Sequence, residues 1–179
     1  MALGKSDKAS GVGAHTRPSW DEYFIRISTE VATRSTCLRR HVGAVLVLNK
    51  RMLCTGYNGV PQGLKHCSET GCPRQAKGVA SGTGWELCRG LHAEMNALLQ
   101  AATHGIPVSG ATLYSTAFPC SLCAKMLINA GIQRVVAASD YPDGLAKEMF
   151  SEAGVKVEFF DEKTRKTRPF RPIRKPQKY

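Results

Sequence analysis

The chain contains no long apolar run and few acidic residues. None of its hydrophobic stretches approaches the roughly eighteen residues that a membrane-spanning helix requires, so we expect no membrane segment. No apolar signal segment opens it, and seven cysteines without such a segment favour a reducing, cytoplasmic location over a disulfide-linked secreted protein. No internal repeat is visible. With 179 residues, 42% of them hydrophobic, the chain is expected to fold as one globular domain.

Basic residues outnumber acidic ones by 25 to 14, which gives a formal net charge of +11. Residues 161–179 hold eight of the basic and two of the acidic residues, a net +6. We expect this proline-interrupted segment to be a flexible basic tail, with contact to nucleic acid, a neighbouring subunit or phosphate ligands as the alternatives. Residues 1–18 are expected to be a flexible leader, which leaves 19–160 as the folded domain.

The most specific local pattern is a His-x-Glu sequence followed by Pro-Cys-x-x-Cys. His92, Cys120 and Cys123 offer three zinc ligands, and Glu94 is a carboxylate that need not bind the metal. A tetrahedral zinc with three protein ligands keeps its fourth position for water, as in catalytic sites. This pairing of motifs is a known signature of zinc-dependent nucleobase deaminases. A purely structural zinc with a fourth protein ligand is the alternative.

Glu94 has an expected role because zinc cannot move protons. Zinc lowers the pKa of a bound water from 15.7 to about 7, but a carboxylate must carry the proton. We expect Glu94 to take the water proton, deliver it to a pyrimidine ring and help to protonate the departing ammonia.

Apolar periodicity predicts alternating strands and helices. Expected helices cover residues 20–31, 92–104, 120–130 and 144–153, and expected strands cover 42–48, 51–56, 111–116, 134–138 and 155–160. The first two strands read as a hairpin joined by Asn49 and Lys50, and the others follow in βαβ order. This order predicts a three-layer α/β/α fold around a five-stranded mixed sheet.

Further segments accompany the zinc pattern and point to one family. They are Arg34-Ser-Thr-Cys37, Val42-Gly-Ala-Val45, Thr55-Gly-Tyr-Asn-Gly59 with Pro61 and Gly63, His66-Cys67 and Gly131-Ile132. With them, residues 19–160 resemble the deoxycytidylate deaminases of the cytidine deaminase-like superfamily. The zinc motif alone would leave adenosine, guanine and riboflavin-pathway deaminases open, whereas the Gly-Tyr-Asn-Gly and Arg-Ser-Thr-Cys segments favour the nucleotide enzyme.

The resemblance implies hydrolysis of dCMP to dUMP and ammonia, which feeds thymidylate synthesis. It also implies a homo-oligomer, a hexamer or a dimer, that dCTP activates and dTTP inhibits. The effector would lie near the loop after the second strand, at Gly56, Tyr57, Asn58, Gly59 and Gly63.

Substrate contacts follow from the same resemblance. It places Asn58 against the nucleoside sugar and Tyr141 near the ribose phosphate, although Asn58 could be an ordinary turn residue and Tyr141 a surface aromatic. Phe118 could line the base pocket or belong to the core. Three cations could meet the phosphate, and the sequence does not rank them: Arg26, Arg34 and Lys125.

A second, structural zinc could use cysteines that the catalytic site leaves free. Cys37 and Cys67 occupy positions where some members of the family carry ligands of an additional zinc. Cys72 and Cys88 are further candidates because their thiols can also bind zinc. Residues 63–84 have little apolar pattern, and a long loop of this kind needs a cross-link. His66 could replace one cysteine, and four reduced cysteines without metal remain the alternative. Cys54 is expected in the core.

Two other functional classes remain open. One is a deaminase that edits tRNA or single-stranded DNA, for which the basic tail would supply phosphate affinity. The other is a catalytically silent binding module. Glu94 argues against silence and the Asn58 loop argues against a polymer, so we expect a small nucleotide substrate rather than nucleic acid.

Overall fold

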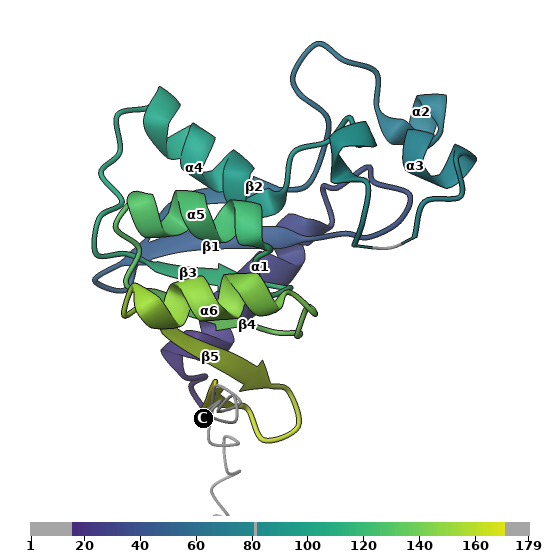
Figure 1. Ribbon diagram of the computed structural model, residues 1–179. Helices are drawn as coiled ribbons and strands as arrows, with labels where there is room; N and C mark the ends of the chain where they lie inside the picture. Colours follow the sequence, from purple (N-terminus) through teal and green to yellow (C-terminus); the bar gives the residue numbers. More distant parts are fainter. Residues whose placement is uncertain (1–15, 81, 171–179) are drawn as a thin grey trace, which may run out of the picture.

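A mixed β-sheet of six strands forms the centre of the molecule (Figure 1). The computed structural model describes residues 16–80 and 82–170. Within these residues the strand order is β2-β1-β3-β4-β5-β6, with β1 antiparallel to β2 and β3, β3 to β5 parallel, and β6 antiparallel to β5. The strands are β1 (Gly43–Leu48), β2 (Arg51–Tyr57), β3 (Thr112–Ser115), β4 (Arg134–Ala137), β5 (Lys156–Asp161) and β6 (Lys166–Pro169).

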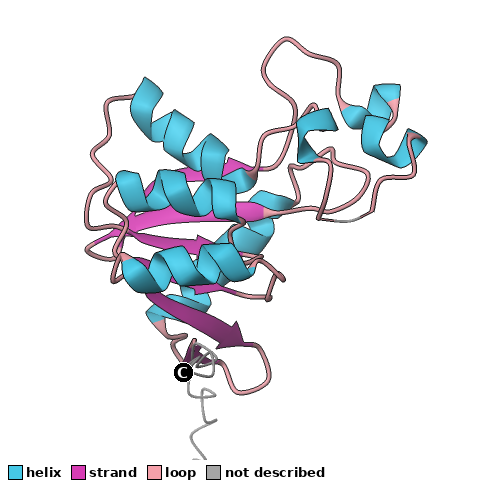
Figure 2. Ribbon diagram, viewed as in Figure 1, coloured by secondary structure: helices cyan, strands magenta, loops and turns pink. Residues whose placement is uncertain are grey.

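Helices cover both faces of the sheet, as predicted (Figure 2). One face carries α1 (Trp20–Ala32), which begins at the N-cap Ser19 and packs Phe24 and Ile25 against Val45 and Val136. The other face carries α4 (Ala93–Thr103), α5 (Ser121–Asn129) and α6 (Gly144–Glu152). Alternate strand residues therefore serve the two layers, as the period of two in a strand requires.

The sixth strand corrects the expected count of five. β6 lies inside residues 161–179, which the composition indicated to be a flexible tail. Asp161 starts the turn before it, because its carboxylate accepts hydrogen bonds from the backbone amides of Lys163 and Thr164 at 2.9 and 3.1 Å. The strand is mostly exposed and charged, as edge strands often are, so it carries no apolar alternation. Most of the expected leader, residues 1–15, and residues 171–179 lie outside the described residues.

The hairpin between β1 and β2 has the predicted turn. Asn49 and Lys50 have φ angles of 50° and 62°, which is the left-handed pair that a two-residue type I′ turn needs.

No helix among the described residues is both long and apolar enough to cross a membrane. The helix α1, for example, has only 13 residues.

A long connection between β2 and α4 carries three short helical turns. They are α2 (Cys67–Thr70), α3 (Pro73–Ala76) and the 3₁₀ turn η1 (Trp85–Leu87), and α2 and α3 stand out from the sheet in Figure 1. This connection ends at the start of α4. It therefore brings its side chains to the edge of the sheet where α4 and α5 begin.

Candidate metal centre and active site

The start of α4 is fixed against strand β2 by backbone contacts. A Cβ on Gly56 would lie 2.2 Å from the carbonyl oxygen of Ala93, so only glycine lets the helix lie this close. Gly59 and Leu91 exchange two backbone hydrogen bonds of 3.2 and 2.8 Å. The side-chain amide of Asn96 donates to the Tyr57 carbonyl at 2.7 Å. These contacts fix the backbone on both sides of residue 92, the N-cap of α4.

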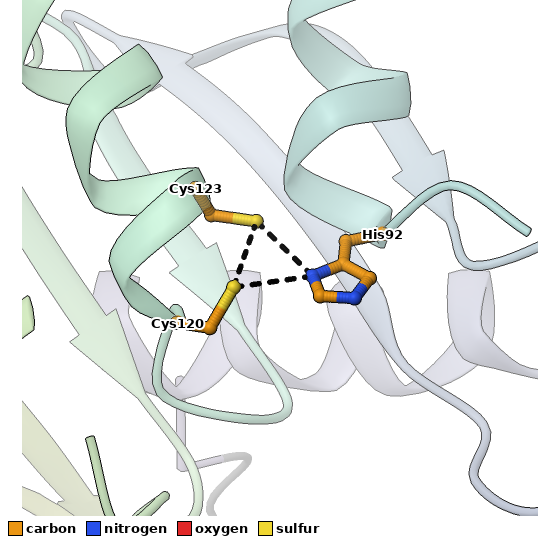
Figure 3. Close-up of side chains that lie close together, drawn as sticks. All are labelled: His92, Cys120 and Cys123. Atoms are coloured by element: carbon orange, nitrogen blue, oxygen red, sulfur yellow. Dashed lines mark hydrogen bonds between the residues drawn. The ribbon is translucent and has the colours of Figure 1, made fainter. Parts of the chain in front are cut away.

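Three predicted metal ligands converge between the starts of two helices (Figure 3). His92 is the N-cap of α4, Cys120 is the N-cap of α5, and Cys123 lies in the first turn of α5. The Nδ1 atom of His92 lies 3.3 Å from each cysteine Sγ, and the two Sγ atoms are 3.7 Å apart. All three ligand atoms fall within 4.8 Å of one another.

These distances fit a tetrahedral zinc ion. With Zn–S near 2.3 Å and Zn–N near 2.05 Å, tetrahedral angles place two sulfurs about 3.8 Å apart and sulfur about 3.6 Å from nitrogen. The observed 3.7 and 3.3 Å lie close to those separations. Three ligands of this kind leave a fourth position open, so the donor set suits a catalytic rather than a closed structural zinc.

The electrostatics of the cluster favour ionised sulfur at Cys120. The hydrogen bond between the Cys120 and Cys123 sulfurs lowers the pKa of Cys120 to about 4. Burial of the thiol opposes this shift, and the hydrogen bond with His92 adds to it. The same pairing raises the pKa of Cys123, and its hydrogen bond to Cys120 raises that of His92. The surroundings of Cys120 therefore favour its thiolate, the form in which cysteine binds metal.

Glu94 lies beside this cluster, as predicted. It is in the first turn of α4 and only 4% exposed, and it interacts with both His92 and Cys123. Burial raises the pKa of its carboxyl group. A raised pKa suits a group that must both accept and release a proton near neutral pH.

A single cavity joins the metal cluster to the expected substrate residues. Its walls include His92, Glu94 and Cys120, and also Asn58, Phe118 and Tyr141. The structure therefore brings together the two residues that the resemblance implied, Asn58 and Tyr141, and also Phe118, which was considered for the base pocket.

Asn58 is held by the backbone rather than left free. Its Oδ1 accepts from the Val42 amide and its Nδ2 donates to the Arg40 carbonyl, both at 2.8 Å. Ser35 adds a hydrogen bond of 2.7 Å from its hydroxyl to the carbonyl of Asn58. Asn58 therefore fixes the loop between α1 and β1, and contact with a sugar stays a prediction.

The two aromatic candidates differ in burial. Phe118 is 2% exposed and packs against Phe150 and Phe159, with ring centroids 5.8 Å away in each case, so it belongs to the core and also borders the cavity. Tyr141 is partly exposed, and the Arg40 guanidinium lies 5.8 Å from its ring centroid. Their roles toward a substrate stay predictions.

The cations around the cavity are ones that sequence reasoning missed. Arg39, Arg40, Arg74 and Arg89 border it. None of the three cations considered for the phosphate, Arg26, Arg34 and Lys125, does so among the described residues. Arg26 instead pairs with Glu22 on the opposite face of the sheet. In the sequence, the pair Arg39-Arg40, close after Cys37, was a signal that could have indicated this cationic wall.

The four cysteines considered for a second zinc all border the same cavity. Cys37, Cys67, Cys72 and Cys88 come from four different segments. Burial raises the pKa of Cys67, and the other three cysteines are close enough to raise it further. No group among the described residues besides His92, Cys120 and Cys123 meets the tight 4.8 Å spacing. The remaining Cys54 is buried in the core, as predicted.

An α/β/α domain with this cluster and a buried glutamate beside it defines the class of zinc-dependent base deaminases. Residues 18–139 match the family model for the cytidine and deoxycytidylate deaminase zinc-binding region. The chain belongs to this family, and it is a zinc hydrolase of the deaminase type.

Relatives from several organisms are similar over most of the chain. The deoxycytidylate deaminase of Mycobacterium phage D29 is 45% identical, and the alignment covers 68% of this chain and 95% of that protein. ComE operon protein 2 of Bacillus subtilis is 45% identical over 79% of this chain and 71% of its own length. The Saccharomyces cerevisiae deoxycytidylate deaminase is 39% identical over 86% of this chain, which spans about half, 49%, of that relative.

Solved structures give the same fold. The dCMP deaminase of cyanophage S-TIM5, crystallised with dCMP and dUMP, superposes with a TM-score of 0.68 at 29% identity. The match covers 81% of this chain and 99% of that one. The cytidine deaminase-like fold is therefore confirmed, with six strands in place of five.

Proposed function

We propose that this chain hydrolyses dCMP to dUMP and ammonia. The observation that carries the proposal is a buried carboxylate, Glu94, beside an open three-ligand cluster inside a cavity. The relatives named deoxycytidylate deaminase and the cyanophage complex with dCMP and dUMP support the choice of substrate.

In the proposed mechanism, His92, Cys120 and Cys123 hold the zinc ion. Bound there, zinc supplies a Lewis acid that makes water acidic enough to attack near neutral pH. Glu94 accepts the proton of that water and delivers it to the ring nitrogen N3. As the C4–O bond forms, Glu94 takes the remaining proton from the new C4 hydroxyl and passes it to the exocyclic amine, and the C4–N4 bond then breaks to release ammonia. Phe118 would border the base, while Tyr141 and Asn58 would border the sugar.

The variant Glu94→Gln tests this mechanism. It keeps shape and polarity but removes the proton carrier, so we expect zinc content near wild type and turnover of dCMP lowered at least about 100-fold. Glu86→Gln, on the exposed turn η1, is the matched control and should keep full activity. Ammonia release should be measured for dCMP, CMP, dCTP, deoxycytidine and single-stranded DNA. Appreciable deamination by Glu94→Gln, or release from single-stranded DNA alone, would overturn the proposal.

We also propose a second, structural zinc at Cys37, Cys67, Cys72 and Cys88. Their shared place at the cavity wall supports it, since a metal would cross-link the connection between β2 and α4. Elemental analysis should find about two zinc ions per chain, falling to about one in Cys72→Ser, whose connection should become sensitive to protease. Cys54→Ser, in the core, is the control that should keep both ions. One zinc in the wild-type chain would leave only the catalytic site.

Regulation and assembly complete the proposal. We expect a homo-oligomer, a hexamer or a dimer, in which dCTP activates and dTTP inhibits through a site near residues 56–63. Gly56 and Gly59 fix α4 next to His92, so a ligand there could act on the metal cluster. Light scattering would give the oligomeric state. Sigmoidal dCMP kinetics that become hyperbolic with dCTP would support coupling, and unchanged curves with both triphosphates would reject it.

A further inference from the structure

One carboxylate joins the starts of two helices beside the metal cluster. Asp143 is the N-cap of α6, and its Oδ1 accepts a hydrogen bond of 2.9 Å from the Ala146 amide. Its Oδ2 accepts a second hydrogen bond, of 2.8 Å, from the amide of Ser121, the first residue of α5. The first bond is an ordinary N-cap, whereas the second joins residues that are 22 apart in the sequence. Capping of α6 alone therefore does not account for this side chain.

The Ser121 amide belongs to the peptide group that follows a metal ligand. Its N–H lies in the rigid plane of the peptide bond between Cys120 and Ser121. A hydrogen bond that fixes this plane fixes the backbone dihedral ψ of Cys120, which is 170°. Cys120 precedes the plane and Cys123 follows it in α5, so this dihedral sets how the two sulfurs lie relative to each other, 3.7 Å apart. Asp143 thus acts on the cluster through the backbone of Cys120.

The connection between β4 and α6 holds the chain on both sides of Cys120. The Phe118 amide donates to the Ser139 carbonyl at 2.9 Å, and the Ser121 amide donates to Asp143 at 2.8 Å. A ligand that is held on both sides loses little conformational freedom when a metal binds. The second of these two contacts depends on a side chain, so it can be removed by substitution.

Asp143 is itself held in place by the same connection. Its amide donates to the Tyr141 carbonyl at 2.8 Å. The Asp140 carboxylate accepts from the Tyr141 amide at 2.8 Å and pairs with Lys147 at 2.8 Å. Tyr141 borders the cavity, whereas Asp143 is not among the described residues that line it. Asp143 can therefore affect the reaction only through the backbone that it holds.

We infer that Asp143 is a positioning residue for the metal site, which keeps Cys120 and Cys123 in the geometry that a tetrahedral ion requires. The inference rests on the proposed function, because it takes these cysteines and His92 as ligands of the catalytic zinc. A carboxylate suits this role, since its two oxygens accept from two helices at once. Groups that hold metal ligands without touching the metal commonly change metal affinity about 10- to 100-fold when they are replaced.

Metal titration of Asp143→Ser tests the inference on the full, metal-free chain. Serine is a preferred N-cap, so α6 keeps its cap, but its shorter side chain has one oxygen and cannot also reach the Ser121 amide. Cobalt(II) is the probe, because it takes tetrahedral thiolate and imidazole ligands as zinc does and absorbs visible light. We expect cobalt affinity to fall about 10- to 100-fold and the absorption spectrum to change. The parent chain for all variants carries Cys72→Ser, so that the proposed second zinc site does not contribute.

A proline at residue 121 should restore part of the lost affinity. Proline has no N–H, is tolerated at the first position of a helix, and restricts the residue before it to extended backbone. Cys120 already has that conformation, with φ −73° and ψ 170°. Adding Ser121→Pro to Asp143→Ser therefore fixes the same dihedral by another means, and cobalt affinity should rise again. A role of Asp143 in helix stability alone would give no such recovery.

Asp161→Ser is the matched control. The Asp161 carboxylate also accepts hydrogen bonds from two backbone amides, in the turn before β6, and it is not among the described residues that line the cavity. Its cobalt affinity and spectrum should match those of the parent chain. Circular dichroism should show the same fold for metal-free Asp143→Ser and for the parent. Unchanged cobalt affinity and spectrum in Asp143→Ser, even with a lower melting temperature, or an equal loss in Asp161→Ser, would overturn the inference.

The two proposals fail in different ways. If the parent chain deaminates dCMP with zinc but Asp143→Ser binds cobalt equally well, Asp143 is not a positioning residue and the proposed function stands. If the parent chain binds metal but does not deaminate dCMP, the proposed function fails. The cobalt titration still reports on Asp143 in that case, because metal binding does not need turnover.

Discussion

Replacing Asn58 with alanine should lower stability as well as activity. The change removes two hydrogen bonds of 2.8 Å, one from the Val42 amide and one to the Arg40 carbonyl. The bond at the Arg40 carbonyl is exposed, so water can replace it at a cost of about 0.5 kcal/mol. The partly buried Val42 amide loses its acceptor, which costs about 1–2 kcal/mol.

The expected loss in the free energy of unfolding is therefore about 2 kcal/mol. In a domain of this size that corresponds to a fall of about 4–8 °C in Tm. Urea titration and calorimetry measure the two quantities. Asn58→Asp is the matched variant, because it keeps the acceptor for the Val42 amide. Its second oxygen replaces the donor to the Arg40 carbonyl, but that position is exposed and can be hydrated, so the loss should be smaller than in Asn58→Ala. The KM for dCMP should rise in Asn58→Ala, since the loop that carries Arg39 is no longer held.

An unchanged Tm in Asn58→Ala would refute this reasoning. If stability were kept while kcat/KM fell equally for dCMP and deoxycytidine, Asn58 would act through direct contact with the sugar. If stability fell and KM rose for dCMP but not for deoxycytidine, Asn58 would instead act by fixing the loop.

Three further predictions concern packing, metal and charge. Gly56→Ala should cost about 1–3 kcal/mol in urea titration, because its Cβ would overlap the backbone of α4 at Ala93; wild-type stability would contradict this close approach. Cys120→Ser should lose zinc and Tm together, as measured by elemental analysis and calorimetry; full metal occupancy would show that Cys120 is not a ligand. Arg134→Gln should cost about 2–3 kcal/mol, because Arg134 bonds both carboxylate oxygens of Asp21 at 2.8 and 2.9 Å and the two side chains are only about a quarter exposed. Burial alone would raise the pKa of Asp21, but its hydrogen bonds with Arg134 lower that pKa below its unfolded-state value. The pairing of Asp21 with Arg134 therefore stabilises the fold fully above about pH 4, and this stabilisation is lost as the pH falls through the lower pKa of the folded state. The stability gap between Arg134→Gln and wild type should therefore narrow in acid, and a constant gap would contradict the assignment.

The elements and the metal cluster could be predicted because their signals are local. A helix face repeats every three to four residues, so apolar spacing located α1. A short continuous run of apolar residues located β1, which is buried on both faces. Cys120 and Cys123 lie three residues apart at a helix start, and His92 precedes another, so the residue types and spacing indicated zinc. The strand β6 had no such signal, because an exposed edge strand needs no apolar face.

The arginines of the cavity wall could not be predicted because the wall joins segments that are distant in the sequence. Arg39, Arg74 and Arg89 border one cavity only after the sheet, the long connection and α4 are in place.

At Asn58, a local sequence signal combines with contacts between distant segments. Its amide and its glycine-flanked position predicted a group that presents both a donor and an acceptor, and the structure uses one of each. Their partners are backbone atoms of residues 40 and 42, whose polar groups need hydrogen-bond partners outside the regular helices and strands. That loop carries Arg39, whose buried Nη1 has no protein acceptor. A polar residue beside an active site can thus act on the substrate through the loop that it orders, and from the sequence this role cannot be distinguished from direct contact.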